Sequence, residues 1–240
     1  VFGLDSKYNN NGTAFSEYRV RDGISAREAE AAIGLRNRWE LEKGFYATTS
    51  FEQVKSLSKA DTDNQNSDNT AASLGVEYLA NPNWKAVARI EARWADQSDT
   101  ILNNLGIAYK YSNDVTLLAK NVVSLTDSKN ENSGDRLVDR FQVGAAYRDT
   151  EHNRFDALTK VEYRYDSNKS DLNNPYLKHV YIFSNHLNYH PSRDITLSGQ
   201  YAVKNVDTTF SGLESSGMTH MLSGRAMYDI NERWDAGIHT

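Results

Sequence analysis

The chain has 240 residues, of which 39% are hydrophobic and 25% are charged, and it contains no cysteine. The absence of cysteine excludes a disulfide framework and thiolate metal sites. No apolar run approaches the ~20 residues of a membrane-spanning helix, which excludes a helical membrane protein. The formal net charge of −5 argues against nucleic acid as a partner. The length suits one large all-β domain, and we assign residues 1–240 to it.

Apolar and polar residues alternate with period two along most of the chain, which is the signal of a β-strand with two unlike faces. In residues 29–41, for example, Ile33 and Leu35 fall on one face while Arg36 and Arg38 fall on the other. In chain order, we predict strands near residues 1–8, 13–21, 29–41, 45–57, 71–80, 85–95, 100–111, 115–125, 137–149, 156–166, 178–190, 195–206, 217–229 and 234–240.

The connections between these strands alternate between short and long. We predict short turns at residues 9–12, 42–44, 81–84, 112–114, 150–153, 191–194 and 231–233, and longer polar loops near 22–28, 58–70, 126–136, 167–177 and 207–216. The connection at 96–99 is short for its class. This sorting is typical of an outer-membrane barrel, with short turns periplasmic and long loops outside, whereas a soluble sandwich gives no reason for it.

The repeated hairpin segments resemble those of bacterial outer-membrane β-barrels. "AAIGLRNRWEL", "LGVEYLANPNWKA" and "LGIAYKYSNDVTLLAKN" look most like the C-terminal barrel region of very large Gram-negative surface proteins. This resemblance implies a transmembrane, antiparallel, up-and-down barrel in the outer membrane and no catalytic residues. The strand parity predicts both ends of the segment outside, whereas such barrels keep both termini in the periplasm. We therefore expect the segment to be incomplete at both ends and part of a barrel of 16 or more strands.

Aromatic side chains recur close to the predicted turns and loops. Rings with one polar edge favour the membrane interface, although β-propensity alone also enriches strands in aromatic residues. The predicted membrane-interface aromatics are Trp39, Trp84, Trp94, Tyr109, Tyr147, Tyr165, Tyr189, Tyr228 and Trp234.

If the apolar face meets lipid, the polar face lines the interior, because charged side chains are costly in lipid. The predicted pore-lining residues are Arg19, Arg21, Arg36, Arg38, Arg89, Glu91, Arg93, Lys110, Arg140, Arg148, Lys160, Glu162, Arg164, Lys204 and Arg225. Basic residues dominate this set. One interpretation is a water-filled pore that favours anions. The other is an interior laced with Arg–Glu pairs that hold the wall together.

Catalytic and metal-binding patterns are weak. His186 and His190 lie four residues apart on one predicted strand, and Ser184 would face the same side as His186. Neither arrangement has the third orienting group, or the convergent ligands, that catalysis or metal binding needs. We expect no enzyme activity, no metal site and no cofactor.

Two functions follow from these patterns. The first is a transmembrane pore that transports small anionic solutes, in contact with outer-membrane lipid. The second is a membrane anchor or export conduit for a large surface-exposed region, without transport of its own. A plug or surface domain outside the segment is a further expected partner, and nucleic acid is not.

Overall fold

The computed structural model describes residues 2–22, 27–57, 68–130, 133–169, 171–172, 174–231 and 234–239. These residues form one antiparallel sheet whose strands follow one another in chain order, each paired with the next. The strands are β1 (Phe2–Lys7), β2 (Gly12–Asp22), β3 (Arg27–Glu42), β4 (Phe45–Ser56), β5 (Asn69–Tyr78), β6 (Trp84–Ala95), β7 (Ser98–Lys110), β8 (Val115–Ser128), β9 (Arg136–Arg148), β10 (Phe155–Asn168), β11 (Tyr176–Ser192), β12 (Ile195–Phe210), β13 (Leu213–Asn231) and β14 (Trp234–His239). The predicted all-β, up-and-down architecture of fourteen strands is confirmed. The described residues contain no helix long and apolar enough to cross a bilayer.

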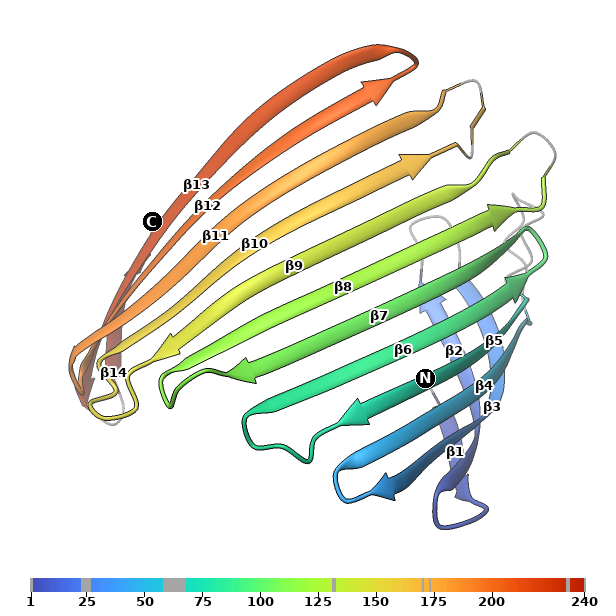
Figure 1. Ribbon diagram of the computed structural model, residues 1–240, viewed down its shortest axis with the longest axis horizontal. Coiled ribbons are helices and arrows are strands. Elements are labelled where there is room, and N and C mark those ends of the chain that lie inside the picture. Colours follow the sequence, from blue (N-terminus) through green and yellow to red (C-terminus); the bar gives the residue numbers. More distant parts are fainter. Residues whose placement is uncertain are drawn as a thin grey trace.

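The short turns lie together at one end of the sheet, which we call the turn end, and the other connections lie at the opposite end, the loop end (Figure 1). Local chemistry closes these turns. Gly44 ends the β3–β4 turn with φ of 75°, a left-handed conformation that favours glycine. In the β9–β10 turn, the Asp149 carboxylate accepts the His152 backbone N–H at 2.9 Å.

Strands at the loop end are longer than predicted. The predicted loop at 207–216 is wrong, because β12 and β13 pair up to Phe210 and Leu213 and are joined by Ser211 and Gly212 alone. Both turn residues have positive φ, 48° and 82°, as a tight two-residue hairpin requires. The polar sequence there resembles a loop, but backbone pairing does not need apolar side chains. The predicted loop residues 23–26 and 58–67 lie outside the described part of the chain.

The sheet is strongly curved and open. In Figure 1, β1 and β14 lie behind the central strands, so the convex face is turned toward the viewer. The described residues show no pairing between β1 and β14. Apart from glycines, the buried residues on the described strands all come from one face of the sheet: Phe15, Ala32, Val54, Ala71, Val180, Glu30 and Glu162. That face is the concave one, and it is enclosed by the curvature.

Candidate pore lining and membrane-facing surface

Strand register brings the predicted lining residues to the concave face. Directly paired residues share a face, and pairing connects Lys120 to Gln142 and Gln142 to Glu162 across three strands. The same tracing puts these predicted residues on the concave face: Arg19, Arg36, Arg38, Arg89, Glu91, Arg93, Lys110, Arg140, Arg148, Lys160, Glu162, Arg164, Lys204 and Arg225. The side chain of Arg21 lies outside the described part of the chain. That the concave face lines a pore remains a prediction.

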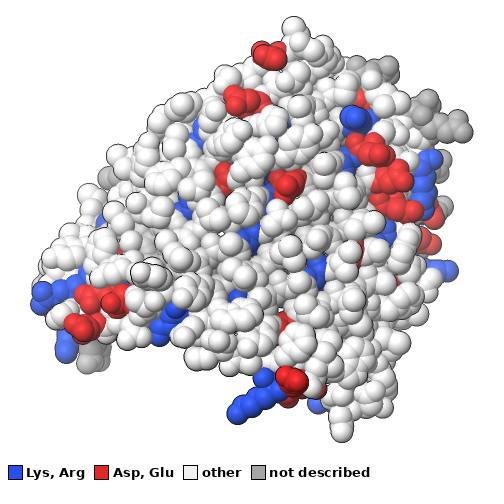
Figure 2. All heavy atoms as spheres, in the orientation of Figure 1, with Lys and Arg blue, Asp and Glu red and all other residues white. Residues whose placement is uncertain are grey.

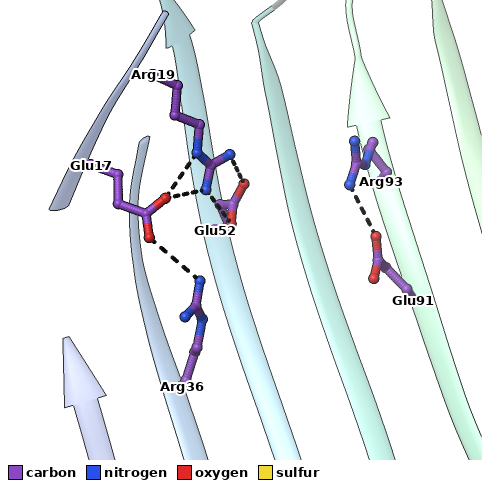
Figure 3. A network of polar contacts seen from close by, with 6 residues as sticks. All are labelled: Glu17, Arg19, Arg36, Glu52, Glu91 and Arg93. Atoms are coloured by element: carbon purple, nitrogen blue, oxygen red, sulfur yellow. Dashed lines mark hydrogen bonds and ion pairs between the residues drawn. The ribbon is translucent and has the colours of Figure 1, made fainter. Parts of the chain in front are cut away.

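A first ion-pair network joins β2, β3 and β4 on this face (Figure 3). The Arg19 guanidinium lies 2.7 Å from a Glu17 oxygen and 3.0 Å from a Glu52 oxygen, and Arg36 reaches Glu17 at 3.9 Å. Arg36 also stands over the Phe15 ring, with 4.0 Å between its guanidinium carbon and the ring centroid. Glu52 was not predicted to line the interior, although the alternation of β4 puts it in phase with Ser50 and Val54.

Two further carboxylates each serve several cations. Glu91 lies between Arg89 at 2.9 Å and Arg93 at 3.2 Å, all on β6. Since residues i and i+2 of a strand share a face, this cluster follows directly from the alternation.

Glu162 is the centre of the most enclosed cluster, with only 2% of its side chain exposed. Arg140 donates two hydrogen bonds to its two oxygens, at 2.7 and 3.0 Å. Gln142 donates a third at 2.6 Å, and the Lys160 ammonium lies at 3.3 Å. Arg164 approaches within 3.9 Å. The desolvation of one buried carboxylate is thus offset by several donors around it.

Other basic side chains of the concave face have no ion pair. Among the described residues, no carboxylate lies within salt-bridge distance of Lys85, Lys110, Lys120 or Lys204. Lys85 and Lys120 were missed at the sequence level, although their strand phase assigns them to the same face as Arg89 and Leu118. Lys85 and Lys110 lie at the turn end of β6 and β7. Part of the positive charge that has no ion-pair partner among the described residues therefore lies at the turn end of the sheet.

The convex face is apolar and exposed. Ile33 is 54% exposed, Ile90 49% and Val161 49%. Figure 2 shows this face as largely uncharged, with charged side chains gathered mainly toward the strand ends. A monomeric soluble protein rarely exposes a contiguous apolar surface of this extent.

The predicted interface aromatics share the convex face and form two groups. Register assigns Trp39, Trp84, Trp94, Tyr109, Tyr147, Tyr165, Tyr189, Tyr228 and Trp234 to it. Most lie at the turn end, whereas Trp94 and Tyr165 lie at the loop end. Trp84 and Trp94 stand ten residues apart on β6. Ten residues of a strand tilted by about 40° rise roughly 25 Å, the height of the apolar band of a membrane barrel.

Polar groups interrupt the convex face at a few points, where they hydrogen-bond one another. The Asn121 amide donates to Asp139 at 2.7 Å, and the Tyr163 hydroxyl lies 2.9 Å from Nδ1 of His179. Internal pairing lowers the cost of leaving polar groups on an otherwise apolar surface.

The candidate catalytic and metal-binding residues do not form a site. His186 hydrogen-bonds Asn188 at 3.1 Å rather than Ser184. Nδ1 of His190 lies 3.2 Å from the Thr196 hydroxyl oxygen, so His190 and His186 hydrogen-bond different residues. Within the described ranges, no three potential metal-ligating side chains converge.

No protein-family profile and no curated protein matches the chain. Among solved structures, the chain is similar to a bacterial polysaccharide outer membrane secretin, with a TM-score of 0.51 and 12% identity, covering 98% of this chain and 79% of that one. A NanC porin is more distant, with a TM-score of 0.36 and 10% identity over 72% of this chain and 81% of that one. The fold is that of an outer-membrane β-barrel wall. The narrower resemblance to the barrel of large surface proteins remains a prediction.

Proposed function

We propose that this chain forms the wall of an outer-membrane pore whose lining favours anions. The concave face carries more basic than acidic side chains, and several of its lysines have no carboxylate within salt-bridge distance among the described residues. That residual positive charge is the observation that carries the proposal. A wall of this kind focuses its field into the lumen and raises the local concentration of anions.

The apolar convex face supports a position in lipid. Its exposed Ile, Leu and Val side chains lie between two groups of aromatic residues spaced as the two membrane interfaces are. We infer that the turn end is periplasmic and the loop end extracellular. A sheet cannot leave strand edges unpaired in hydrocarbon, so the edges of β1 and β14 must each be paired, with one another or with other strands, when the sheet lies in a membrane.

Ion pairs account for part of the basic lining but not for all of it. The carboxylates of Glu17, Glu91 and Glu162 each contact more than one cation. The pairs stabilise the wall, while unpaired groups such as Lys110 and Lys120 supply the field. The two interpretations of the lining thus apply to different residues.

The test is the reversal potential of single channels in a salt gradient, measured on the full-length protein in a planar bilayer. We expect anion-preferring openings. Replacing Lys110 and Lys120 together by glutamine moves the reversal potential toward zero, whereas Lys160→Gln, on the same face but in an ion pair with Glu162 at 3.3 Å, has a smaller effect. Cation preference in the unmodified protein, or no shift in the double variant, contradicts the proposal.

A second candidate is an anchor or export conduit without small-solute transport. The density of ion pairs on the concave face favours it, because such pairs hold a wall together. The similar solved structure is named a polysaccharide secretin, and under this candidate function the exported cargo would be a polysaccharide. A folded, membrane-inserted but electrically silent protein would favour this candidate over the pore.

A further inference from the structure

An apolar hollow interrupts the charged lining of the concave face. It has a volume of about 520 Å³ and lies over β5 to β10 toward the turn end. Val87, Leu118 and Leu158 contribute aliphatic side chains, and Gly106 and Gly144 keep the space open. A Cβ at Gly106 would stand 3.1 Å from Val87 Cγ1, so a side chain there would fill the hollow. In a water-filled interior, apolar surface of this kind favours an apolar occupant.

Two of the three lysines at the border of the hollow have no ion-pair partner among the described residues. Lys85 and Lys120 have no carboxylate within salt-bridge distance among the described residues. Lys160 and Glu77 also border the hollow, but each is already in an ion pair, at 3.3 and 3.0 Å. The uncompensated charge at this border is therefore positive, and an anionic group on the occupant would complement it.

The lining of the hollow suits an aliphatic rather than a sugar ligand. No aromatic side chain of the described residues borders the hollow, so they offer no face on which a sugar ring could stack. Its volume falls within the roughly 300–1,000 Å³ of small-molecule sites.

We propose that this hollow binds a single-chain anionic amphiphile, with the alkyl chain over Val87, Leu118 and Leu158 and the carboxylate between Lys85 and Lys120. This inference rests on one part of the proposed function, namely that the concave face is turned toward the lumen of the barrel. Because the hollow lies toward the turn end, an amphiphile bound there would narrow the lumen at that level.

Photo-crosslinking with a dodecanoate that carries a diazirine at its alkyl end tests the proposal on the full-length protein in lipid nanodiscs. Mass spectrometry then maps the adducts. We expect adducts on concave-face residues of the hollow, such as Val87 and Leu118, and suppression of these adducts by excess dodecanoate but not by dodecanol. Adducts on the convex face, which follow from partition into lipid, serve as an internal reference that neither competitor removes selectively.

Two variants test separately the contribution of the lysine charges and that of the empty volume of the hollow. Replacing Lys85 and Lys120 by glutamine should lower the yield of concave-face adducts about tenfold. The reason is that losing a hydrogen bond to a charged group weakens binding by about tenfold or more. Gly106→Leu should abolish them by filling the hollow. The matched control is Lys204→Gln, an unpaired lysine of the same face on β12, away from the hollow, which should leave them unchanged. Heat-modifiable migration confirms that each variant is folded.

Adducts confined to the convex face, or concave-face adducts insensitive to the double lysine variant, overturn the proposal. The reversal-potential measurement, made without amphiphile, reports separately on the pore. Anion-preferring channels without concave-face adducts would reject the binding site and leave the proposed function standing. Concave-face adducts in a silent barrel would support the site and reject the pore.

Discussion

Glu162 shows how one buried carboxylate can stabilise a cluster of basic side chains on the concave face of the sheet. Its side chain is nearly fully buried, while those of its partners Arg140 and Lys160 remain 41% and 38% exposed. A carboxylate of this kind is stable only because several donors surround it, and those donors would repel one another without it.

Glu162→Gln should therefore destabilise the protein. Loss of one partner of a buried pair costs about 3–5 kcal/mol, and the exposure of the cations reduces the expected cost here to about 1–3 kcal/mol. Urea unfolding in lipid vesicles measures it. The control is Glu77→Gln, whose partner Arg38 is 50% exposed at 3.0 Å, and which should cost less than about 1 kcal/mol. Equal effects of the two variants would contradict the central role of Glu162.

The turn residue Asp114 gives a dependence on pH. Hydrogen bonds from the Thr150 hydroxyl and backbone N–H hold the pKa of the Asp114 carboxyl below its ordinary value of 3.8. A folded-state pKa below the unfolded one contributes stability that is present above the unfolded pKa and is lost as the pH falls through the folded pKa. In Asp114→Asn, the unfolding midpoint should fall less steeply on acidification below about pH 4 than in the unmodified protein. An unchanged acid slope would show that the turn carboxylate contributes nothing.

At the scale of elements, strand alternation was sufficient to predict the number of strands and the common face of those predicted lining residues whose side chains the structure describes. It did not predict which charges meet, because ion pairs such as Arg19–Glu52 and Arg140–Glu162 depend on cross-strand register. The register of a hairpin is set by the length of its turn, and the same short polar sequence is compatible with turns of several lengths. The same limitation explains the wrong loop at 207–216, where polar residues continue two strands to a two-residue turn.

The facing of β9 can be tested with neighbouring residues. Val143 lies on the convex face and Gln142 on the concave face, next to Glu162. Val143→Arg should impair membrane assembly, at a cost of about 2–4 kcal/mol near the bilayer midplane. Gln142→Arg adds the same charge one residue away and should assemble normally. Heat-modifiable migration and membrane yield measure both. Normal assembly of Val143→Arg would contradict the facing of this strand.

At the scale of the whole molecule, the distribution of side chains is the opposite of that in a soluble protein, which buries apolar side chains and exposes charged ones. The charged face of the sheet is enclosed by curvature, and its apolar face is exposed. This arrangement is stable when hydrocarbon covers the outside and water fills the inside. The aromatic groups at both ends of the apolar band and the placement of the longer connections at one end fit the same orientation in a membrane.

The measurement that tests this arrangement most directly is thiol accessibility in intact membranes. The chain has no cysteine, so single cysteines at positions 142 and 143 report without background. A charged, water-soluble thiol reagent should modify Gln142→Cys rapidly and leave Val143→Cys unmodified until detergent is added. Protection of position 142 with ready modification of position 143 would contradict the assignment of lipid to the convex face and water to the concave face.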